Sequence, residues 1–328
     1  MYTMLLARAD VASLLTMSTC IDIVEQVFRA HAQGYALMPP KIRIEIEEKS
    51  GSIGAMPSYL KDIGAAGLKW AGGWSDNPSK GLPFIMAEMF LIDPDSGRLK
   101  AVLEAGYITA LRTGAATAVA ARYLARRDSS SIAIIGAGVQ GRMQLRALHC
   151  VFPVKDIRVA DRSAEAAEKF AENMSVELGT SINSVPDIRL AVDGADIIVT
   201  ATTADQPLVC KDWVSPGAFI ASVGSYPELD PELVLCADKI IVDNWEQNRN
   251  HGEFIRLIEA GRLDETNIHG EMGAVVAGIR PGRESDSELI VAGLIGMGTH
   301  DVACAAYVVD KAIAQGRGAY FDFQQSGS

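Results

Sequence analysis

Residues 131–141, SIAIIGAGVQG, decide the fold of this chain. The β-branched start predicts a buried strand, and the glycines have the GxGxxG spacing that turns a strand tightly into a helix. A helical segment, RMQLRALHCVF (142–152), and a second strand, IRVADRS (157–163), follow. Strand, glycine turn, helix and strand make one βαβ unit, which predicts a parallel sheet that starts here.

The same alternation continues to about residue 298. Three further apolar runs, ADIIVTATT (195–203), GAFIASVGS (217–225) and DKIIVDN (238–244), are separated by helical or loop segments. Runs of this kind suit a parallel sheet that is buried on both faces. We therefore expect an α/β fold with a doubly wound, Rossmann-type domain over residues 129–298.

The flanking residues, 1–128 and 299–328, have a different pattern. KIRIEIE (41–47) alternates strictly and AAGLKWAGG (65–73) is more apolar, so together they suggest a separate mixed sheet. The alanine-rich run 108–127 predicts a long helix with Thr109 as its N-cap. A last helix is expected over residues 299–314, with Thr299 as its N-cap.

Size and charge limit the classes of partner. At 328 residues the chain exceeds the usual size of one hydrophobic core, which favours two domains. The formal net charge of −11 disfavours nucleic acid or an anionic membrane, because both need a basic face. Glycines, His300 and Asp301 interrupt the longest apolar run, 289–309, which therefore predicts a buried strand leading into a helix and no membrane span.

The cysteines indicate a reducing compartment. Cys20, Cys150, Cys210, Cys236 and Cys304 are widely spaced and form no CxxC pair. The first residues, MYTMLLARADVASLL, contain an early arginine and aspartate and do not read as a signal peptide. We therefore expect a cytoplasmic protein.

The glycine turn predicts a dinucleotide site. Gly136 permits the tight turn, Gly138 lets a pyrophosphate approach the backbone, and Gly141 allows the helix to pack closely on the strand. The acidic residue expected about twenty positions further on is Asp161, whose carboxylate suits the ribose hydroxyls. A glycine-rich turn also occurs for packing alone, but here strand, helix and acid agree.

The choice between NAD and NADP depends on three neighbouring residues. Asp161 favours NAD because its charge repels a 2′-phosphate. Arg162 and Ser163 beside it are able to bind such a phosphate, which keeps NADP as the alternative. Further cofactor contacts are expected at Val139, Gln140, Thr202 and Ser225. No metal site is predicted.

Two cations stand in unusual surroundings. Lys69 is flanked by apolar or small residues, where an unpaired ammonium carries a heavy desolvation cost. The alternative is a lysine whose stem reaches solvent from a strand edge. Arg112 follows the expected N-cap Thr109 by three residues, which would put its cation near a first helical turn, where cations are disfavoured. A solvated arginine or a structural ion pair explains that position nearly as well.

Lys41 and Arg43 share one face of the strand 41–47, opposite Ile42, Ile44 and Ile46. They are candidates for binding an anionic substrate. Because two glutamates continue the same face, a solvated strand face is the simpler interpretation.

Several segments together resemble the ornithine cyclodeaminase/mu-crystallin family over nearly the whole chain. They are MPPKIRIEI, AMPSY, GLKW, NPSKGLP, ALRTGAATAVAARYLAR, GAGVQGRMQLRAL and GMGTHDVACAA. KGLPFIMA is most similar to the alanine dehydrogenase and ketimine reductase branch. The resemblance implies an α+β substrate-binding and dimerisation domain (1–128 with 299–328) into which the Rossmann-type nucleotide domain (129–298) is inserted, and hence a homodimer.

The resemblance also implies roles for the candidate residues. Lys69 matches a lysine near the reacting carbon and nitrogen, and Arg112 matches an arginine that binds the substrate carboxylate. Asp301 matches an acid near the active site. Lys41 or Arg43 matches a second cation near the carboxylate.

Two departures narrow the expected chemistry. Ser225 and Tyr226 stand where cyclodeaminases of the family have an aspartate, and Gly54 stands where alanine dehydrogenases have an arginine. We therefore expect NAD(P)H-dependent reduction of the C=N bond of a small α-imino acid to an α-amino acid. The several cations would suit a dicarboxylic substrate, but they would equally suit one carboxylate with redundant charge. The imine is either preformed or made from an oxo acid and ammonia. The rivals are a cyclodeaminase that uses bound NAD and a non-enzymatic, crystallin-like cofactor binder.

Overall fold

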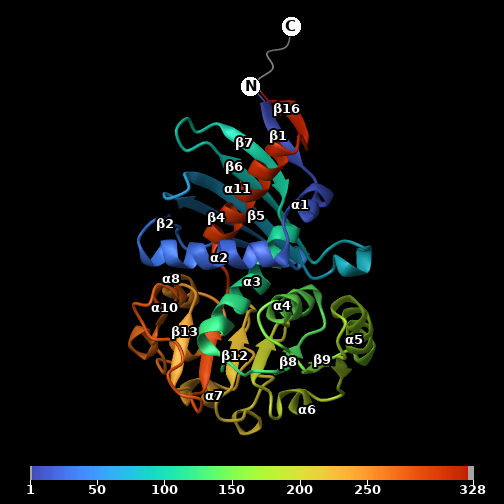
Figure 1. Cartoon of the computed structure of the whole chain (residues 1–328), viewed down its shortest axis with the longest axis vertical. Helices are drawn as coiled ribbons and strands as arrows, with labels where there is room; N and C mark the ends of the chain where they lie inside the picture. Colours follow the sequence, from blue (N-terminus) through green and yellow to red (C-terminus); the bar gives the residue numbers. More distant parts are fainter. Residues whose placement is uncertain (1, 324–328) are drawn as a thin grey trace. The chain divides into compact units, whose positions relative to one another are not determined.

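The computed structural model of the chain describes residues 2–323 (Figure 1). These residues divide into two compact units, unit 1 (residues 2–112 and 297–323) and unit 2 (residues 113–296). The first division falls inside helix α3 (Gly106–Leu124), sixteen residues before the expected domain boundary at 128/129. The two units have different sheets.

Unit 1 is built on one mixed sheet of eight strands. The strands pair in the order β16-β1-β7-β6-β5-β4-β2, and β3 also pairs with β4. β1 and β7 are parallel, whereas the other neighbours are antiparallel. The strands are β1 (Tyr2–Leu6), β2 (Ala36–Leu37), β3 (Ile42–Ile46), β4 (Gly51–Leu60), β5 (Ala65–Trp74), β6 (Ile85–Ile92), β7 (Leu99–Glu104) and β16 (Ala319–Asp322). The expected mixed sheet is confirmed, although its last strand, β16, was not predicted.

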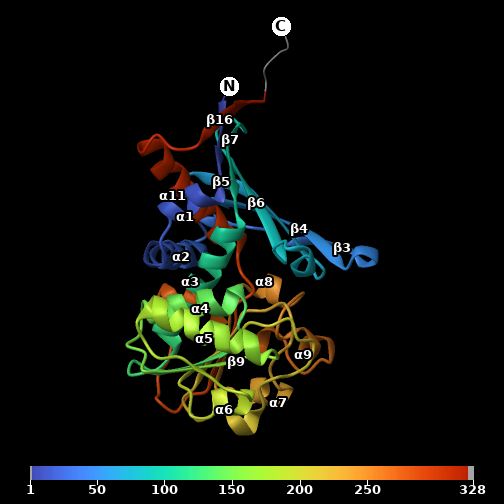
Figure 2. The ribbon, with the colours of Figure 1, turned by 90° about the vertical axis from the view of Figure 1, so that its right-hand side faces the viewer.

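Helices cover one face of this sheet. α11 packs on β4, β5 and β6, and α2 packs on α11, on the side of the sheet that Figure 2 shows to the left. Together with the first turns of α3, the helical segments of unit 1 are α1 (Arg8–Leu14), α2 (Met17–Ala32), α11 (Gly298–Ala314) and the short 3₁₀ turns η1 (Glu47–Lys49) and η2 (Pro78–Lys80). Side chains of β4 and β5 that face α11 are therefore shielded from water.

Glycines at two positions allow α11 to lie close to the sheet. A Cβ atom on Gly298 would lie 2.5 Å from Oγ of Ser58 on β4. A Cβ atom on Gly67 of β5 would lie 2.7 Å from the carbonyl oxygen of Phe90 and 3.2 Å from Cγ2 of Val302 on α11. Larger residues at either position would push the helix away from the strands.

The start of α3 differs from the sequence expectation. The helix begins at Gly106, so Thr109 lies inside it and is not the N-cap, and Arg112 lies in the second turn instead of the first. The carboxylate of Glu104 accepts a hydrogen bond from the backbone N–H of Tyr107, at 3.1 Å. Glu104 thus satisfies a backbone N–H of the first turn. The helix therefore starts one turn earlier than it would if Thr109 were its N-cap.

α11 also starts earlier than expected. It begins at Gly298 after the N-cap Met297, so Thr299 is inside the helix and the predicted cap is wrong. The apolar run 289–309 does contain a buried strand, β15 (Ile290–Gly293), followed by this helix, as predicted.

No single helix within residues 2–323 is long and apolar enough to cross a membrane. The pair α1 and α2 reaches the necessary length and hydropathy only when the two helices are taken together, and the pair is bent by 81°.

The two faces of β3 are the reverse of the simplest sequence interpretation. Ile42 and Ile44 are 60% and 58% exposed, whereas Lys41 and Arg43 are half-buried. The cationic face of this strand is thus not a fully solvated face, and its apolar face is open.

Unit 2 is a doubly wound parallel sheet, which confirms the Rossmann-type prediction. The strand order is β10-β9-β8-β11-β12-β15-β13-β14, and every neighbouring pair is parallel. Besides β15, the strands are β8 (Ser131–Ile135), β9 (Asp156–Ala160), β10 (Asn183–Ser184), β11 (Ile197–Thr200), β12 (Phe219–Ser222), β13 (Lys239–Val242) and β14 (Gly270–Glu271). The chain goes outward from β8 to β10 and then crosses to β11, so the strand order reverses between β8 and β11.

The connections of unit 2 are mostly helical. They are the later turns of α3, α4 (Val139–His149), α5 (Ala164–Leu178), α6 (Ile188–Val192), α7 (Pro231–Leu235), α8 (Trp245–Asn248), α9 (Ile255–Glu259), α10 (Met272–Val276), η3 (Lys211–Trp213) and η4 (Glu265–Asn267). The central strands are buried along their whole length, as a sheet with helices on both faces requires. In such sheets ligands bind at the carboxyl ends of the strands, at the point where the order reverses.

Candidate active site

Three charged side chains of unit 1 meet in its interior. Nζ of Lys69, on β5, lies 2.8 Å from Oδ2 of Asp301, on α11. Nε of Arg112, on α3, lies 3.2 Å from Oδ1 of the same carboxylate. Lys69, Arg112 and Asp301 are 1%, 5% and 0% exposed. The alternative of a lysine that reaches solvent is therefore wrong, and the ammonium is buried in an ion pair.

Thr109 joins these three residues from the same helix as Arg112, one turn earlier. Its hydroxyl lies 3.4 Å from Nζ of Lys69 and 3.4 Å from Oδ1 of Asp301. The sequence had suggested only a capping role for this threonine. Its spacing of three residues from Arg112, which places both on one helix face, is the signal that would have identified it.

Burial and charge set the protonation of this cluster. Burial, together with the neighbouring Arg112, lowers the pKa of Lys69 to about 8, although Asp301 opposes the shift. Burial alone would raise the pKa of Asp301, but Arg112 and Lys69 outweigh it and hold that pKa below the usual value. At neutral pH the carboxylate is thus ionised and the ammonium keeps a proton that it is poised to release.

Lys41 belongs to the same electrostatic environment, and Arg43 less so. Burial lowers the pKa of Lys41, with further contributions from Arg43 and Arg112. A Cβ atom on Gly54 would lie 2.9 Å from Cε of Lys41, so the glycine leaves room for the lysine stem across β4. Arg43 forms an ion pair with Glu45 on its own strand.

One donor of Arg112 lacks a protein partner. While Nε is bonded to Asp301, Nη1 is buried and makes no hydrogen bond within the described residues. An unsatisfied buried guanidinium nitrogen is costly, and a carboxylate is the group that best satisfies it.

His300 is a neighbour that the sequence did not single out. It is fully buried, and its ring packs edge-on against Phe28 of α2, with ring centroids 4.6 Å apart. Burial, together with Arg112, lowers its pKa to about 3, so the imidazole is neutral at ordinary pH. This residue adds no charge to the cluster.

In unit 2, the glycine turn has the geometry of a dinucleotide cradle. A Cβ atom on Gly136 would lie 2.6 Å from the carbonyl oxygen of Ala201, and one on Gly141 would clash with the carbonyl oxygen of Gly136. Above Gly138 there is open space. Gly136 has a φ of 112°, which side chains rarely tolerate. The turn thus needs the first and third glycines for its own packing and leaves the second open to a ligand, at the N-terminus of α4.

Asp161, at the end of β9, borders this turn. Its carboxylate accepts hydrogen bonds from the backbone N–H groups of Ala137, at 2.8 Å, and Ser163, at 2.9 Å. The hydroxyl of Ser163 is the N-cap of α5, and the side chain of Arg162 is exposed. Asp161 is therefore hydrogen-bonded directly to the glycine turn. Among the described residues, Arg162 and Ser163, the two that would favour NADP, make no such bond to the turn.

The remaining predicted cofactor residues of unit 2 lie at the start of α4 and in the loops after β11 and β12. Val139 opens α4 and is 63% exposed. Oε1 of Gln140 next to it is buried and has no hydrogen-bond partner among residues 2–323. Thr202 follows β11, and its Cγ2 would lie 3.1 Å from a Cβ atom on Gly136. Ser225, after β12, is exposed.

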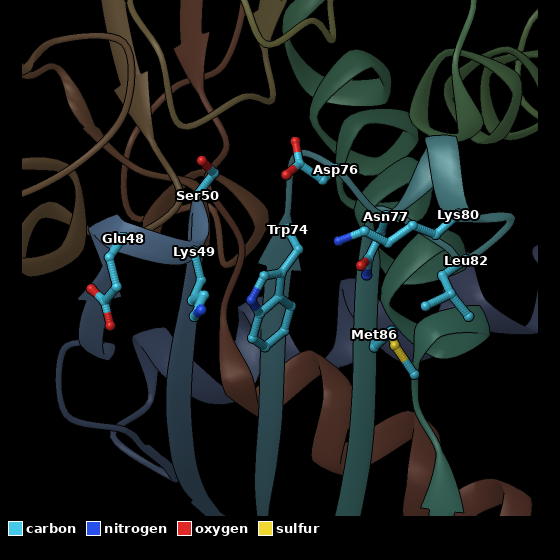
Figure 3. A pocket seen from close by; sticks show the side chains of 9 residues that line it. All are labelled: Glu48, Lys49, Ser50, Trp74, Asp76, Asn77, Lys80, Leu82 and Met86. Atoms are coloured by element: carbon cyan, nitrogen blue, oxygen red, sulfur yellow. The ribbon is translucent and has the colours of Figure 1, made fainter.

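A separate pocket of about 500 Å³ lies at the ends of β4 and β5, and Figure 3 labels its lining residues. Asn77, Lys80 and Leu82 come from the segment NPSKGLP, and the Trp74 indole lies over Gly51 and Gly72. None of the predicted site residues lines this pocket. Within residues 2–323, no group of His, Cys, Asp and Glu side chains is placed to hold a metal ion.

Comparisons with known proteins agree with this architecture. A family model described as "Ornithine cyclodeaminase/mu-crystallin family" matches residues 1–316. The solved Δ1-pyrroline-2-carboxylate reductase of Thermococcus litoralis, in complex with NADH and L-proline, is 39% identical, with a TM-score of 0.94 over 97% of this chain and 99% of that one. An archaeal alanine dehydrogenase dimer with bound NAD is 38% identical, with a TM-score of 0.93 over 98% and 100%. The iminosuccinate reductase of Paracoccus denitrificans is 33% identical over 95% of this chain and 98% of its own.

Proposed function

The chain belongs to the ornithine cyclodeaminase/mu-crystallin family, and from this premise we propose that it reduces the C=N bond of a small α-imino acid with NADH, giving an α-amino acid. The observation that carries the proposal is Nη1 of Arg112, which is buried next to the Lys69–Asp301 ion pair and makes no hydrogen bond to any residue of the described range 2–323. Arg112 suits a substrate carboxylate, and the Lys69 ammonium suits a substrate nitrogen to which it donates a proton. An α-imino or α-amino acid carries both groups on one carbon.

The residues of unit 1 divide the work as follows. Arg112, assisted by Lys41, binds the substrate carboxylate and so fixes the position of the neighbouring carbon. Lys69 donates a proton to the substrate nitrogen, and Asp301 keeps the ammonium charged and oriented. NADH, when bound, supplies the hydride that the carbon accepts. Imine, NADH and a proton thus give amine and NAD+, and Lys69 recovers its proton from water.

The cofactor is assigned to unit 2. Gly136, Gly138 and Gly141 would hold the pyrophosphate, and Asp161 would bind the ribose hydroxyls of the adenosine half. The carboxylate beside the turn supports NAD as the preferred form, with NADP as the alternative. Val139, Gln140, Thr202 and Ser225 are the further proposed contacts.

A substrate screen tests the reaction. The full-length protein is mixed with NADH and with pyruvate, glyoxylate or oxaloacetate, each with ammonia or methylamine, and with cyclic imino acids. We expect NADH oxidation with at least one group and formation of the matching amino acid. Ammonia release from a diamino acid without net change in NADH would instead support a cyclodeaminase. Ser225 and Tyr226, which lie exposed after β12 where cyclodeaminases of the family have an aspartate, argue against that activity. Cofactor binding without turnover of any substrate would support the crystallin-like alternative.

We also propose that unit 1 forms a homodimer through its open apolar surface. Large apolar side chains are exposed along β2 and β3, in the segment just before β6 and at the start of β6: Leu37, Ile42, Ile44, Leu82, Phe84, Ile85 and Met86. Such a cluster favours a protein partner, and a second copy is the partner that a symmetric enzyme offers. Ile44→Lys should shift the sedimentation of the wild-type dimer to that of a monomer, whereas a wild type that sediments as a monomer contradicts the proposal.

A cytoplasmic location remains a prediction that rests on the five free cysteines.

A further inference from the structure

Two carboxylates are buried in unit 2 without a cation. Glu228 and Glu253 are 0% and 2% exposed. Within residues 2–323, neither forms an ion pair with a lysine, arginine or histidine. A buried carboxylate without a cation is expensive, so its presence calls for a reason beyond stability.

Hydrogen bonds hold Glu228 at the carboxyl ends of β11 and β12. Its Oε1 accepts from the backbone N–H of Thr202, at 2.9 Å, and from the hydroxyl of the same residue, at 2.5 Å. Oε2 makes no hydrogen bond to any of the described residues, although the nearby Thr200 hydroxyl favours the charged form of the carboxyl group. A Cβ atom on Gly224 would lie 3.0 Å from this oxygen.

Glu253 fixes the backbone that carries Glu228. It accepts hydrogen bonds from the hydroxyl of Ser222, at 2.8 Å, and from the backbone N–H groups of Glu228, at 2.9 Å, and Leu229, at 3.0 Å. Both ends of the loop after β12 are therefore tied to one side chain. The Glu228 carboxylate is held rigidly, and through Thr202 it is connected to the loop beside Gly136.

The position of Glu228 in the sheet indicates which half of a bound dinucleotide its charge would affect. In a doubly wound sheet the two halves of a dinucleotide lie on either side of the point where the strand order reverses. Asp161 and β9 lie on the adenosine side of that point, so β11 and β12 lie on the nicotinamide side. Glu228 is thus a fixed negative charge in the half of unit 2 that faces the nicotinamide.

We propose that Glu228 sets the balance between oxidised and reduced cofactor by favouring the positively charged nicotinamide of NAD+ over the neutral ring of NADH. This inference rests on the proposed binding of NAD to unit 2. The physical basis is electrostatic, because a desolvated charge acts over a longer range than one at the surface. Burial raises the pKa of Glu228 to about 6 and that of Glu253 to about 8, so at pH 8 Glu228 is ionised and Glu253 is about half protonated.

The test measures cofactor binding without substrate. Dissociation constants of NADH, from its fluorescence, and of NAD+, by competition, are compared at pH 8 for the full-length wild type and Glu228→Gln. Glutamine keeps the shape of the side chain and the acceptor for Thr202 but removes the charge. We expect the ratio Kd(NAD+)/Kd(NADH) to rise about fivefold, which corresponds to one unit charge acting at roughly 10 Å through a partly screened interior.

Matched variants separate charge from packing. Glu232→Gln makes the same change at an exposed residue of α7 that is paired with Arg262, and it should leave the ratio unchanged. Glu228→Asp keeps the charge, so both affinities should fall while the ratio stays near that of the wild type. If Glu228→Gln does not fold, the ratio for the wild type is compared at pH 8 and pH 5. Because the pKa of Glu228 is about 6, its protonation at the lower pH should raise the ratio.

The outcomes are distinguishable. A ratio that is unchanged in folded Glu228→Gln overturns the inference and leaves Glu228 as a packing residue, while NAD binding itself stands. If Glu228→Gln does not fold, a wild-type ratio that does not rise between pH 8 and pH 5 overturns it equally. A wild type that binds neither NAD+ nor NADH overturns the proposed function, and this inference with it.

Discussion

Replacement of Asp301 by asparagine should move the pH dependence of the enzyme in a direction that the buried cluster dictates. In the wild type the pKa of Lys69 is about 8, so a reaction that needs the ammonium proceeds below this pH and weakens above it. Asp301 raises the pKa of Lys69, whereas burial, Arg112 and Lys41 lower it. An asparagine would keep the shape of the side chain and remove only the negative charge that opposes this lowering. The pKa of Lys69 should therefore fall further.

The magnitude follows from the distance between the charges. An opposite charge within about 4–6 Å shifts a pKa by roughly 1 to 3 units, and Nζ of Lys69 lies 2.8 Å from the carboxylate. The upper limb of the kcat/KM profile should move down by a shift of that order. The assay is kcat/KM for imine reduction between pH 5 and 10, with thermal unfolding as the check on the fold.

Asp310→Asn is the matched control, because Asp310 is an exposed residue on the same helix. It should leave the limb near pH 8. If Asp301→Asn folds, retains measurable activity and keeps its upper limb at the wild-type position, Lys69 is not the group that titrates and its role as proton donor is wrong.

Three further changes probe the other parts of the account. Arg112→Ala should raise KM for the acid substrate by a factor that corresponds to roughly 2 to 4 kcal/mol, with NADH affinity unchanged; an unaltered KM would make Arg112 structural. Asp161→Ala should weaken NADH binding and relax discrimination against NADPH, and a wild type that already prefers NADPH tenfold would refute the assignment. Lys69→Met should flatten the pH dependence of the free energy of unfolding. Between pH 8 and 10.5 the unfolded wild type holds a proton on Lys69 that the folded state has released. The free energy of unfolding of the wild type should therefore rise with pH in this window relative to that of the variant. An equal slope in both proteins would mean that Lys69 is not buried in solution.

The sequence predicted best where one short segment determines its own structure. Much of the glycine requirement of the turn 136–141 lies within its six residues, because Gly141 contacts the backbone of Gly136 and Gly136 has a φ of 112°. Lys69 was also identifiable, since an ammonium among small and apolar residues is conspicuous. Its partner followed only from the family resemblance: Asp301 lies 232 residues away, and no local pattern shows that α11 covers β5.

Other features depend on contacts that are remote in sequence. β16 exists because it pairs with β1 at the opposite end of the chain. The exposure of Ile42 and Ile44 reverses the usual preference of strand faces. Glu228 resembles an ordinary loop glutamate until Glu253 and Thr202 are seen to hold it, which is why it was missing from the expected site.

The central claim is that hydride passes from NADH to the α-carbon of an imino acid held by Arg112 and Lys69. NADH labelled with deuterium at the transferred position, together with the imino acid that performs best in the screen, tests it directly by mass spectrometry of the amino acid product. We expect the wild type to form an amino acid with one deuterium at the α-carbon, and we expect the rate of its formation to fall by about 100-fold or more in Lys69→Met. An amino acid product without deuterium, or labelled product formed equally fast by Lys69→Met, would contradict it.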